Sequence, residues 1–68
     1  MRIQINGEER EFERELPLAE LIQHLSLPAE RIAVELNRHV IAREQWPATL
    51  VKDGDRLEIV HFVGGGSV

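Results

Sequence analysis

The chain has 68 residues, of which 43% are hydrophobic and 29% charged, and its formal net charge is −4. This length and composition are typical of one small globular domain and argue against disorder. Basic residues are scattered, and the aromatic residues are few (Phe12, Trp46 and Phe62), which does not suit a nucleic-acid-binding surface. Cysteine is absent, which excludes disulfides, thiolate metal sites and cysteine nucleophiles.

The sequence offers no segment that would carry the protein into or across a membrane. No apolar run approaches the roughly 20 residues of a membrane-spanning helix. The N-terminal stretch MRIQINGEERE becomes acidic too early for a signal peptide. We therefore expect a cytoplasmic protein.

The chain begins with a predicted β-hairpin. Residues 2–5 alternate between polar and apolar side chains, which is the period of a half-buried strand. Asn6-Gly7 follows, and this dipeptide is the strongest short hairpin signal. A second strand is expected at about residues 9–13, with Phe12 facing inward. The many charges of this second strand suit the edge of a sheet.

One amphipathic helix is predicted next. Leu18, Leu21, Ile22 and Leu25 recur at helical spacing and form one apolar stripe. Pro17 suits the first turn of a helix, and a proline at position 28 marks where the helix has to stop. The pattern predicts a helix of about three turns.

Two further strands are expected after the helix. Residues 32–36 (IAVEL) predict a strand, Asn37-Arg38 a turn, and residues 39–41 a short return strand. Residues 42–52 show no clear period, although their last hydrophobic residues, Leu50 and Val51, are expected to pack against the core.

The last predicted strand runs over residues 56–63, after a turn at Asp53-Gly54-Asp55. Leu57 and Ile59 share one face, which we assign to the core, and His61 and Val63 continue that face. Glu58, Val60 and Phe62 lie on the other face. Val60 and Phe62 form either a partner-docking patch or part of a curled sheet that buries both faces.

The order of hairpin, helix, two strands, irregular segment and last strand predicts an α+β fold of the β-grasp type. In this architecture a mixed sheet of four to five strands curls round one helix, and the first and last strands lie parallel at its centre. Residues 1–63 would form this single domain. Residues 64–68 would form a flexible C-terminal glycine tail.

Three consecutive glycines, Gly64 to Gly66, follow the last predicted strand. Glycine costs backbone entropy and packs nothing, so these residues are either a frayed end or an unhindered tail that a partner requires. The three histidines lie in separate elements without metal-ligand spacing, and no catalytic constellation of side chains can be assembled. The sequence therefore predicts neither a metal site nor intrinsic enzyme activity.

Several of these features together resemble the ThiS family, the sulfur-carrier proteins of thiamine biosynthesis. The resemblance extends from Met1 to Gly66 and rests on Asn6-Gly7, LAELIQHL, IAVELN, the DGD turn and the ending IVHFVGGG. It implies a β-grasp, ubiquitin-like fold. It also implies a protein co-substrate whose C-terminal glycine is adenylated by an ATP-dependent ThiF-like enzyme and then converted to a thiocarboxylate.

Further partners and site residues are implied by the same resemblance. A ThiG-like thiazole synthase would take the sulfur for the thiazole ring, and a cysteine desulfurase or rhodanese-like protein would supply it. The carrier itself would bind no cofactor, since the activating enzyme uses the ATP. Gly66 would carry the acyl adenylate and the thiocarboxylate. The expected partner-binding residues are Gly64, Gly65, Val60, Phe62 and Val63.

Ser67-Val68 departs from the family pattern, because it places two residues after the glycines. We hypothesise that the active form ends at Gly66 once this dipeptide, a natural pro-tail or a remnant of cloning, has been removed.

Two alternatives to the thiazole pathway stay open. One is a sulfur carrier for molybdopterin synthesis or tRNA thiolation, and the other is a β-grasp module that binds its partner without covalent chemistry.

Overall fold

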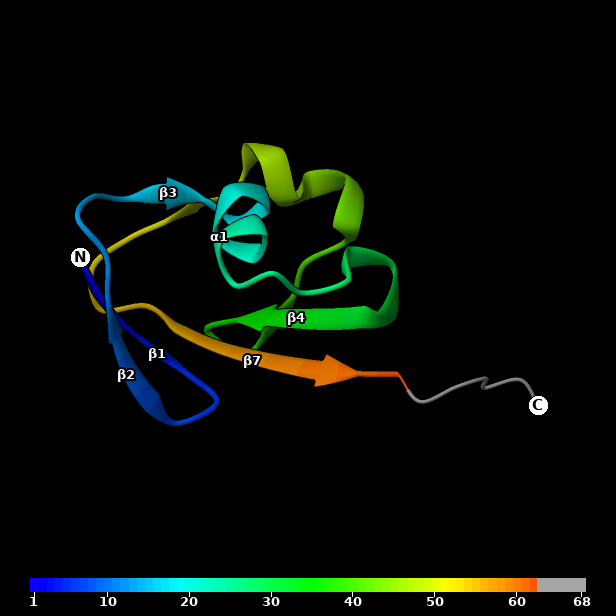
Figure 1. Ribbon diagram of the computed structural model, residues 1–68, viewed down its shortest axis with the longest axis horizontal. Coiled ribbons are helices and arrows are strands. Elements are labelled where there is room, and N and C mark those ends of the chain that lie inside the picture. Colours follow the sequence, from blue (N-terminus) through cyan, green and yellow to red (C-terminus); the bar gives the residue numbers. More distant parts are fainter. Residues whose placement is uncertain (63–68) are drawn as a thin grey trace.

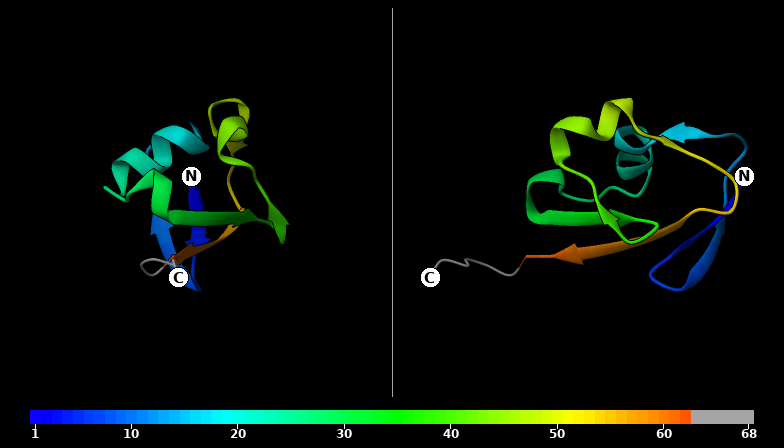
Figure 2. Two further views of the ribbon diagram at one scale, coloured as in Figure 1. Left: turned by 90° about the vertical axis from the view of Figure 1, so that its right-hand side faces the viewer. Right: turned by 180° about the vertical axis from the view of Figure 1, so that it is seen from behind.

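The structure is a computed structural model that describes residues 1–62 of the chain. Its elements form a curled sheet with one α-helix and a 3-10 helix on the same side (Figure 1 and Figure 2). In chain order they are β1 (Arg2–Ile5), β2 (Glu8–Glu11), β3 (Leu16–Pro17), α1 (Leu18–His24), η1 (Ala29–Arg31), β4 (Ile32–Leu36), β5 (His39–Val40), η2 (Arg43–Ala48), β6 (Leu50–Val51) and β7 (Arg56–His61).

The main sheet has five strands in the order β2-β1-β7-β4-β5. β1 and β7 are parallel, and every other neighbouring pair in this sheet is antiparallel. The first and last strands therefore lie side by side at the centre, and β2 is an edge strand, as the sequence predicted. This mixed sheet with a helix across one face confirms the β-grasp fold.

The β1–β2 hairpin turns at Asn6 and Gly7, which have φ angles of 52° and 84°. Positive φ at both central residues is the requirement of a type I′ turn, and Asn-Gly meets it at little steric cost. The second strand is shorter than predicted, because β2 ends at Glu11. Phe12 lies just beyond the strand, partly buried against the core, and its N–H donates to the carbonyl oxygen of Met1 over 2.8 Å.

The helix is also shorter than predicted. It has seven residues, which is about two turns rather than three. Pro17 is not in its first turn but is the extended residue before it, with φ −60° and ψ 145°. At the other end, Leu25 caps the helix and Ser26 has a φ of 58°, a left-handed conformation that prevents a further turn.

The segment without clear period contains structure that the pattern did not reveal. Residues 43–48 form η2, and β6 pairs antiparallel with β3 in a second, two-stranded sheet. Trp46 is buried, and its Nε1–H donates to the carbonyl oxygen of Ile41 over 2.9 Å. Val51 is buried as expected, but the prediction that Leu50 packs is wrong, since 45% of its surface is exposed. Successive strand residues face opposite sides, so only one of the two reaches the core.

The core fills the space between the sheet and the helices α1 and η2. Twelve buried apolar residues form it within the described chain, and none of the buried residues there is polar or charged. They are Ile3, Ile5, Leu16, Leu18, Leu21, Ile22, Ile32, Val34, Trp46, Val51, Leu57 and Ile59. None of the helices formed by residues 1–62 is long and apolar enough to cross a membrane.

Candidate functional site

The central strand β7 contains Val60, and Phe62 follows directly after its end, so this strand positions the predicted site residues that the structure describes. Leu57 and Ile59 face the core and are buried, as predicted. β1 lies beside β7 on one edge and β4 on the other. The strand that precedes the glycines in the sequence is therefore the middle strand of the five-stranded sheet (Figure 1).

Val60 and Phe62 lie on the outer face of the sheet, away from the helix. They are 56% and 57% exposed, which rules out the alternative that a curled sheet buries them. Val60 pairs across the ladder with Ala33 of β4. Large apolar side chains that stay exposed side by side on one face are typical of a protein-binding surface.

β7 ends at His61, although the sequence predicted a strand as far as residue 63, and one backbone hydrogen bond holds Phe62 just beyond its end. The N–H of Phe62 donates to the carbonyl oxygen of Arg31 over 2.7 Å, which continues the pairing of β4 with β7 by one residue. His61 lies on the same face as Ile59, as predicted, but the buried core ends before it and its side chain is exposed.

Asn6 makes a contact with β7 that the sequence analysis missed. Its side-chain Nδ2 donates to the carbonyl oxygen of Ile59 over 3.1 Å, and its Oδ1 accepts from the N–H of Ile59 over 2.7 Å. The sequence pattern assigned Asn6 a turn and nothing else. A side-chain contact across 53 residues leaves no local signal, so only the topology reveals it.

The start of β7 is held by the predicted turn at residues 53–55. Asp53 Oδ1 accepts from the N–H of Arg2 over 2.7 Å, and Asp55 Oδ2 accepts from the N–H of Lys52 over 2.8 Å. Gly54 has a φ of 89°, which explains the need for glycine between the two aspartates. The Asp53 carboxylate thus ties the turn to β1, and the Asp55 carboxylate bonds a backbone group next to the turn as well as the side chain of Asn37.

Six residues of the predicted site and tail lie outside the described residues. They are Val63, Gly64, Gly65, Gly66, Ser67 and Val68. Of the predicted partner-binding residues, the structure therefore describes Val60 and Phe62. The roles assigned to the glycines stay predictions.

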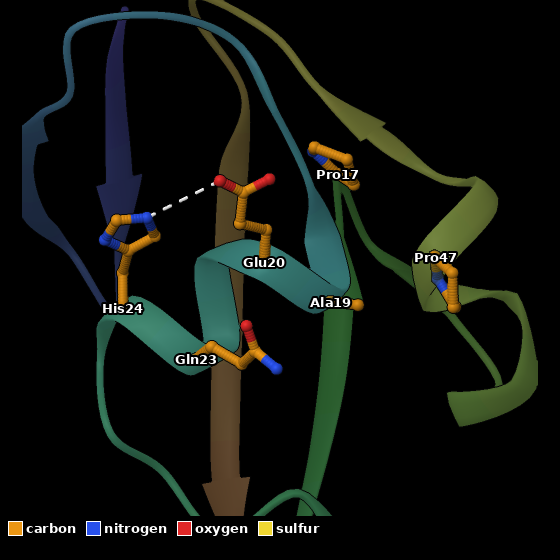
Figure 3. Close-up of a pocket in the computed structure, with 6 residues that line it drawn as sticks. All are labelled: Pro17, Ala19, Glu20, Gln23, His24 and Pro47. Carbon is orange, nitrogen blue, oxygen red and sulfur yellow. Dashed lines mark ion pairs between the residues drawn. The ribbon is translucent and has the colours of Figure 1, made fainter.

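The histidines are not brought together. His24 lies in α1, His39 in β5 and His61 in β7, and no group of three or more potential metal ligands occurs among residues 1–62. His24 Nε2 lies 3.7 Å from Glu20 Oε2 at one side of a shallow surface pocket, and Pro47 of η2 lies at the other side (Figure 3). This pocket contains none of the predicted site residues.

Comparison with known proteins agrees with the fold. A model of the ThiS family matches residues 3–66. A crystal structure of the thiamine biosynthesis protein ThiS from Geobacter metallireducens has 40% sequence identity and a TM-score of 0.87, over 97% of this chain and all of that one. The sulfur carrier protein ThiS of Bacillus subtilis is 32% identical over 65 residues, which are 94% of this chain and 98% of that protein.

A larger relative contains a segment similar to the whole chain. The thiazole synthase of Paramagnetospirillum magneticum is 40% identical over 67 residues, which are 98% of this chain and 21% of that protein. The chain spans about a fifth of the length of the thiazole synthases that it matches. The family match runs from β1 through β7 to Gly66, and the β-grasp fold agrees with it, so the chain belongs to the ThiS family.

Proposed function

We propose that this protein is a sulfur carrier of thiamine biosynthesis that acts through a thiocarboxylate on Gly66. The observation that carries the proposal is the family match, which continues beyond β7 and ends at the third glycine. The names of the two small relatives and the fold support the same function. In this function the protein is a co-substrate, and partner enzymes perform the catalysis.

The chemistry requires an activated terminal carbonyl. A carboxylate is a poor electrophile because its charge is delocalised and repels nucleophiles. Attack of a carboxylate oxygen of Gly66 on the α-phosphorus of ATP forms an acyl adenylate and releases pyrophosphate. A sulfur nucleophile from a donor such as a cysteine desulfurase or rhodanese-like protein then attacks the carbonyl carbon, and AMP leaves. When this nucleophile is a persulfide of the donor, the product is an acyl disulfide. A thiolate then attacks the donor's sulfur atom, which forms a disulfide between thiol and donor and leaves Gly66 with a thiocarboxylate.

Glycine suits this position because it lacks a Cβ. A nucleophile can approach the Gly66 carbonyl from either face without a clash with a side chain. Gly64 and Gly65 can adopt backbone conformations that other residues rarely adopt, which would let them pass through a narrow channel of the partner. In the sequence Ser67 follows Gly66, so this function requires cleavage of the bond between them.

Val60 and Phe62 form the proposed docking patch for the adenylating enzyme and the thiazole synthase. Val60 is exposed on β7 and Phe62 is exposed directly after that strand, so apolar surface lies on the segment that precedes the glycines in the sequence. Thiazole synthases that contain a segment similar to this chain support the proposal of a ThiG-like partner. The ThiF-like partner is proposed because an acyl adenylate must be formed from ATP.

Intact mass measurement tests the proposal. The protein would be isolated from its native cells and then incubated with ATP, the adenylating enzyme and a sulfur donor. Loss of Ser67-Val68, followed by exchange of one terminal oxygen for sulfur, is the expected result. A chain whose mass never changes in the presence of active partner enzymes would leave the non-covalent docking module as the function.

The identity of the sulfur acceptor needs a separate experiment. A deletion strain that requires thiamine would support the thiazole pathway. A strain that grows without thiamine but loses molybdoenzyme activity or tRNA thiolation would assign the carrier to one of those pathways instead.

A further inference from the structure

Beyond Ile5, where β1 ends, the side chain of Asn6 bonds β7 in the place that a further residue of β1 would occupy. The two strands pair through Gln4 with Arg56 and Ile5 with Leu57, and β1 ends there. At Asn6 the backbone turns away with a φ of 52°, yet its amide side chain bonds both backbone groups of Ile59. A carboxamide offers one acceptor and two donors, so it can satisfy an N–H and a carbonyl oxygen as the next residue of a strand would.

This contact lies where β7 approaches the glycines. On its other edge, β7 is held by the bond from Phe62 N–H to the carbonyl oxygen of Arg31. The final part of the described strand is therefore fixed from both sides, by Asn6 at Ile59 and by Arg31 at Phe62. Gly66 follows Ile59 by seven residues in the sequence.

We propose that Asn6 is a positioning residue for the reaction at Gly66, an inference that rests on the proposed function. Its amide fixes the direction in which β7 presents the chain to the adenylating enzyme. Without the amide, the end of β7 is held on one edge only, by β4, so it varies more in direction and a smaller fraction of the molecules is oriented for binding. The apparent affinity falls by that fraction, whereas the rate of the chemical step in the bound complex is unchanged.

Asn37 provides a matched control at the opposite end of the same strand. Its φ is 51°, almost the value at Asn6. Its Oδ1 accepts from the N–H of Arg56 over 3.0 Å, and its Nδ2 donates to Asp55 Oδ1 over 3.0 Å. The two asparagines thus share residue type, turn geometry and the use of the amide, but Asn37 holds the beginning of β7.

The experiment compares Asn6→Gly with Asn37→Gly. Glycine accepts the positive φ of both turns, so each substitution removes an amide without straining the backbone. The chain that ends at Gly66 retains all elements described above, and it is the substrate in an ATP–pyrophosphate exchange assay with the adenylating enzyme. Urea denaturation of each variant measures its stability, and amide hydrogen exchange measures the protection of Ile59.

We expect both variants to be folded at the assay temperature and to lose similar stability. Asn6→Gly should raise the KM for the carrier about tenfold with little change in kcat, as expected when about a tenth of the molecules is competent to bind. Its Ile59 amide should also exchange faster. Asn37→Gly should leave both the KM and the exchange at Ile59 close to those of the unaltered chain.

Equal KM values for the two variants would overturn the positioning role, because loss of stability alone would then explain both. If Asn6→Gly does not fold, Asn6→Asp replaces it. That variant keeps an acceptor for Ile59 N–H and loses the donor to its carbonyl oxygen, so a raised KM is again expected and an unchanged KM refutes the role. Failure of the unaltered chain to be adenylated by an active enzyme would overturn the proposed function and this inference together. If the unaltered chain is adenylated, the KM values of the variants test the positioning role of Asn6 and leave the proposed function intact.

Discussion

Phe62 is held in the sheet by its backbone while its side chain stays exposed. Its N–H donates to the carbonyl oxygen of Arg31 over 2.7 Å, although 57% of the residue's surface is accessible. Side chains two residues apart in a strand point to the same face, so Phe62 and Val60 present apolar surface together. The backbone bond thus gives the docking patch a fixed position relative to the sheet.

The patch predicts that Phe62→Ala weakens binding to the adenylating enzyme without unfolding the carrier. Burial of a phenylalanine side chain in an interface contributes about 1.5–3 kcal/mol, so the Kd should rise by about one to two orders of magnitude. Because the side chain is exposed in the free protein, the free energy of unfolding should change by less than about 0.5 kcal/mol. Titration calorimetry and urea denaturation measure the two quantities.

Leu50→Ala is the control for this prediction. Leu50 is also an exposed apolar residue, but it lies on β6 in the second sheet. Its substitution should leave the Kd unchanged. Equal losses of affinity for the two variants would show that Phe62 has no particular role in docking.

Gly66→Val tests where the chemistry takes place. A branched side chain next to the reacting carbonyl blocks the approach of a nucleophile, so the thiocarboxylate should not form. The fold should be unaffected, because every described element lies before residue 63. Mass spectrometry after incubation with ATP, the adenylating enzyme and a sulfur donor reads the outcome.

A chain that ends at Gly66 with its native glycine is the positive control, and it should be loaded without prior proteolysis. If Gly66→Val is loaded as fast as this control, the reacting carbonyl is not at residue 66.

The hairpin and the central strand could be predicted because their signals are local. The dipeptide Asn6-Gly7 indicates the type of turn, and the alternation of polar and apolar residues around Leu57 and Ile59 indicates which face of the strand is buried. The pairing of β3 with β6 could not be predicted, since two-residue strands are too short to show a period. The helix length was wrong because its stripe continues to Leu25 and only the left-handed Ser26 ends it.

The candidate site was predictable in part for the same reason. The positions of Val60 and Phe62 on the outer face follow from alternation along the strand, and their exposure confirms it. The amides of Asn6 and Asn37 act on β7 from distant turns, so their roles depend on the topology of the sheet. A hydrogen bond between residues far apart in sequence has no periodic pattern by which it could be recognised.

Trp46→Phe should destabilise the protein by more than about 1 kcal/mol, because the smaller ring leaves a cavity in the core in addition to the loss of one hydrogen bond. The substitution keeps an aromatic side chain in the core but removes the Nε1–H that donates to the carbonyl oxygen of Ile41. Urea denaturation measures the change. An unchanged free energy of unfolding would mean that the core closes the cavity and that water or another donor satisfies the Ile41 carbonyl equally well.

Val34→Ala and Val40→Ala make the same chemical change in neighbouring strands with opposite environments. Val34 of β4 is 1% exposed, whereas Val40 of β5 is 72% exposed. Loss of two buried methyl groups and the resulting cavity should destabilise the first variant by about 2 kcal/mol. The second variant should change the free energy of unfolding by less than about 0.5 kcal/mol.

Urea denaturation of both variants in parallel isolates the contribution of burial, because the atoms removed are identical. In a domain of this size, which buries only about 60% of the surface of its unfolded chain, a loss of 2 kcal/mol is a large part of the total stability. Similar losses for the two variants would mean that β propensity, rather than packing between the sheet and α1, determines the stability of β4 and β5.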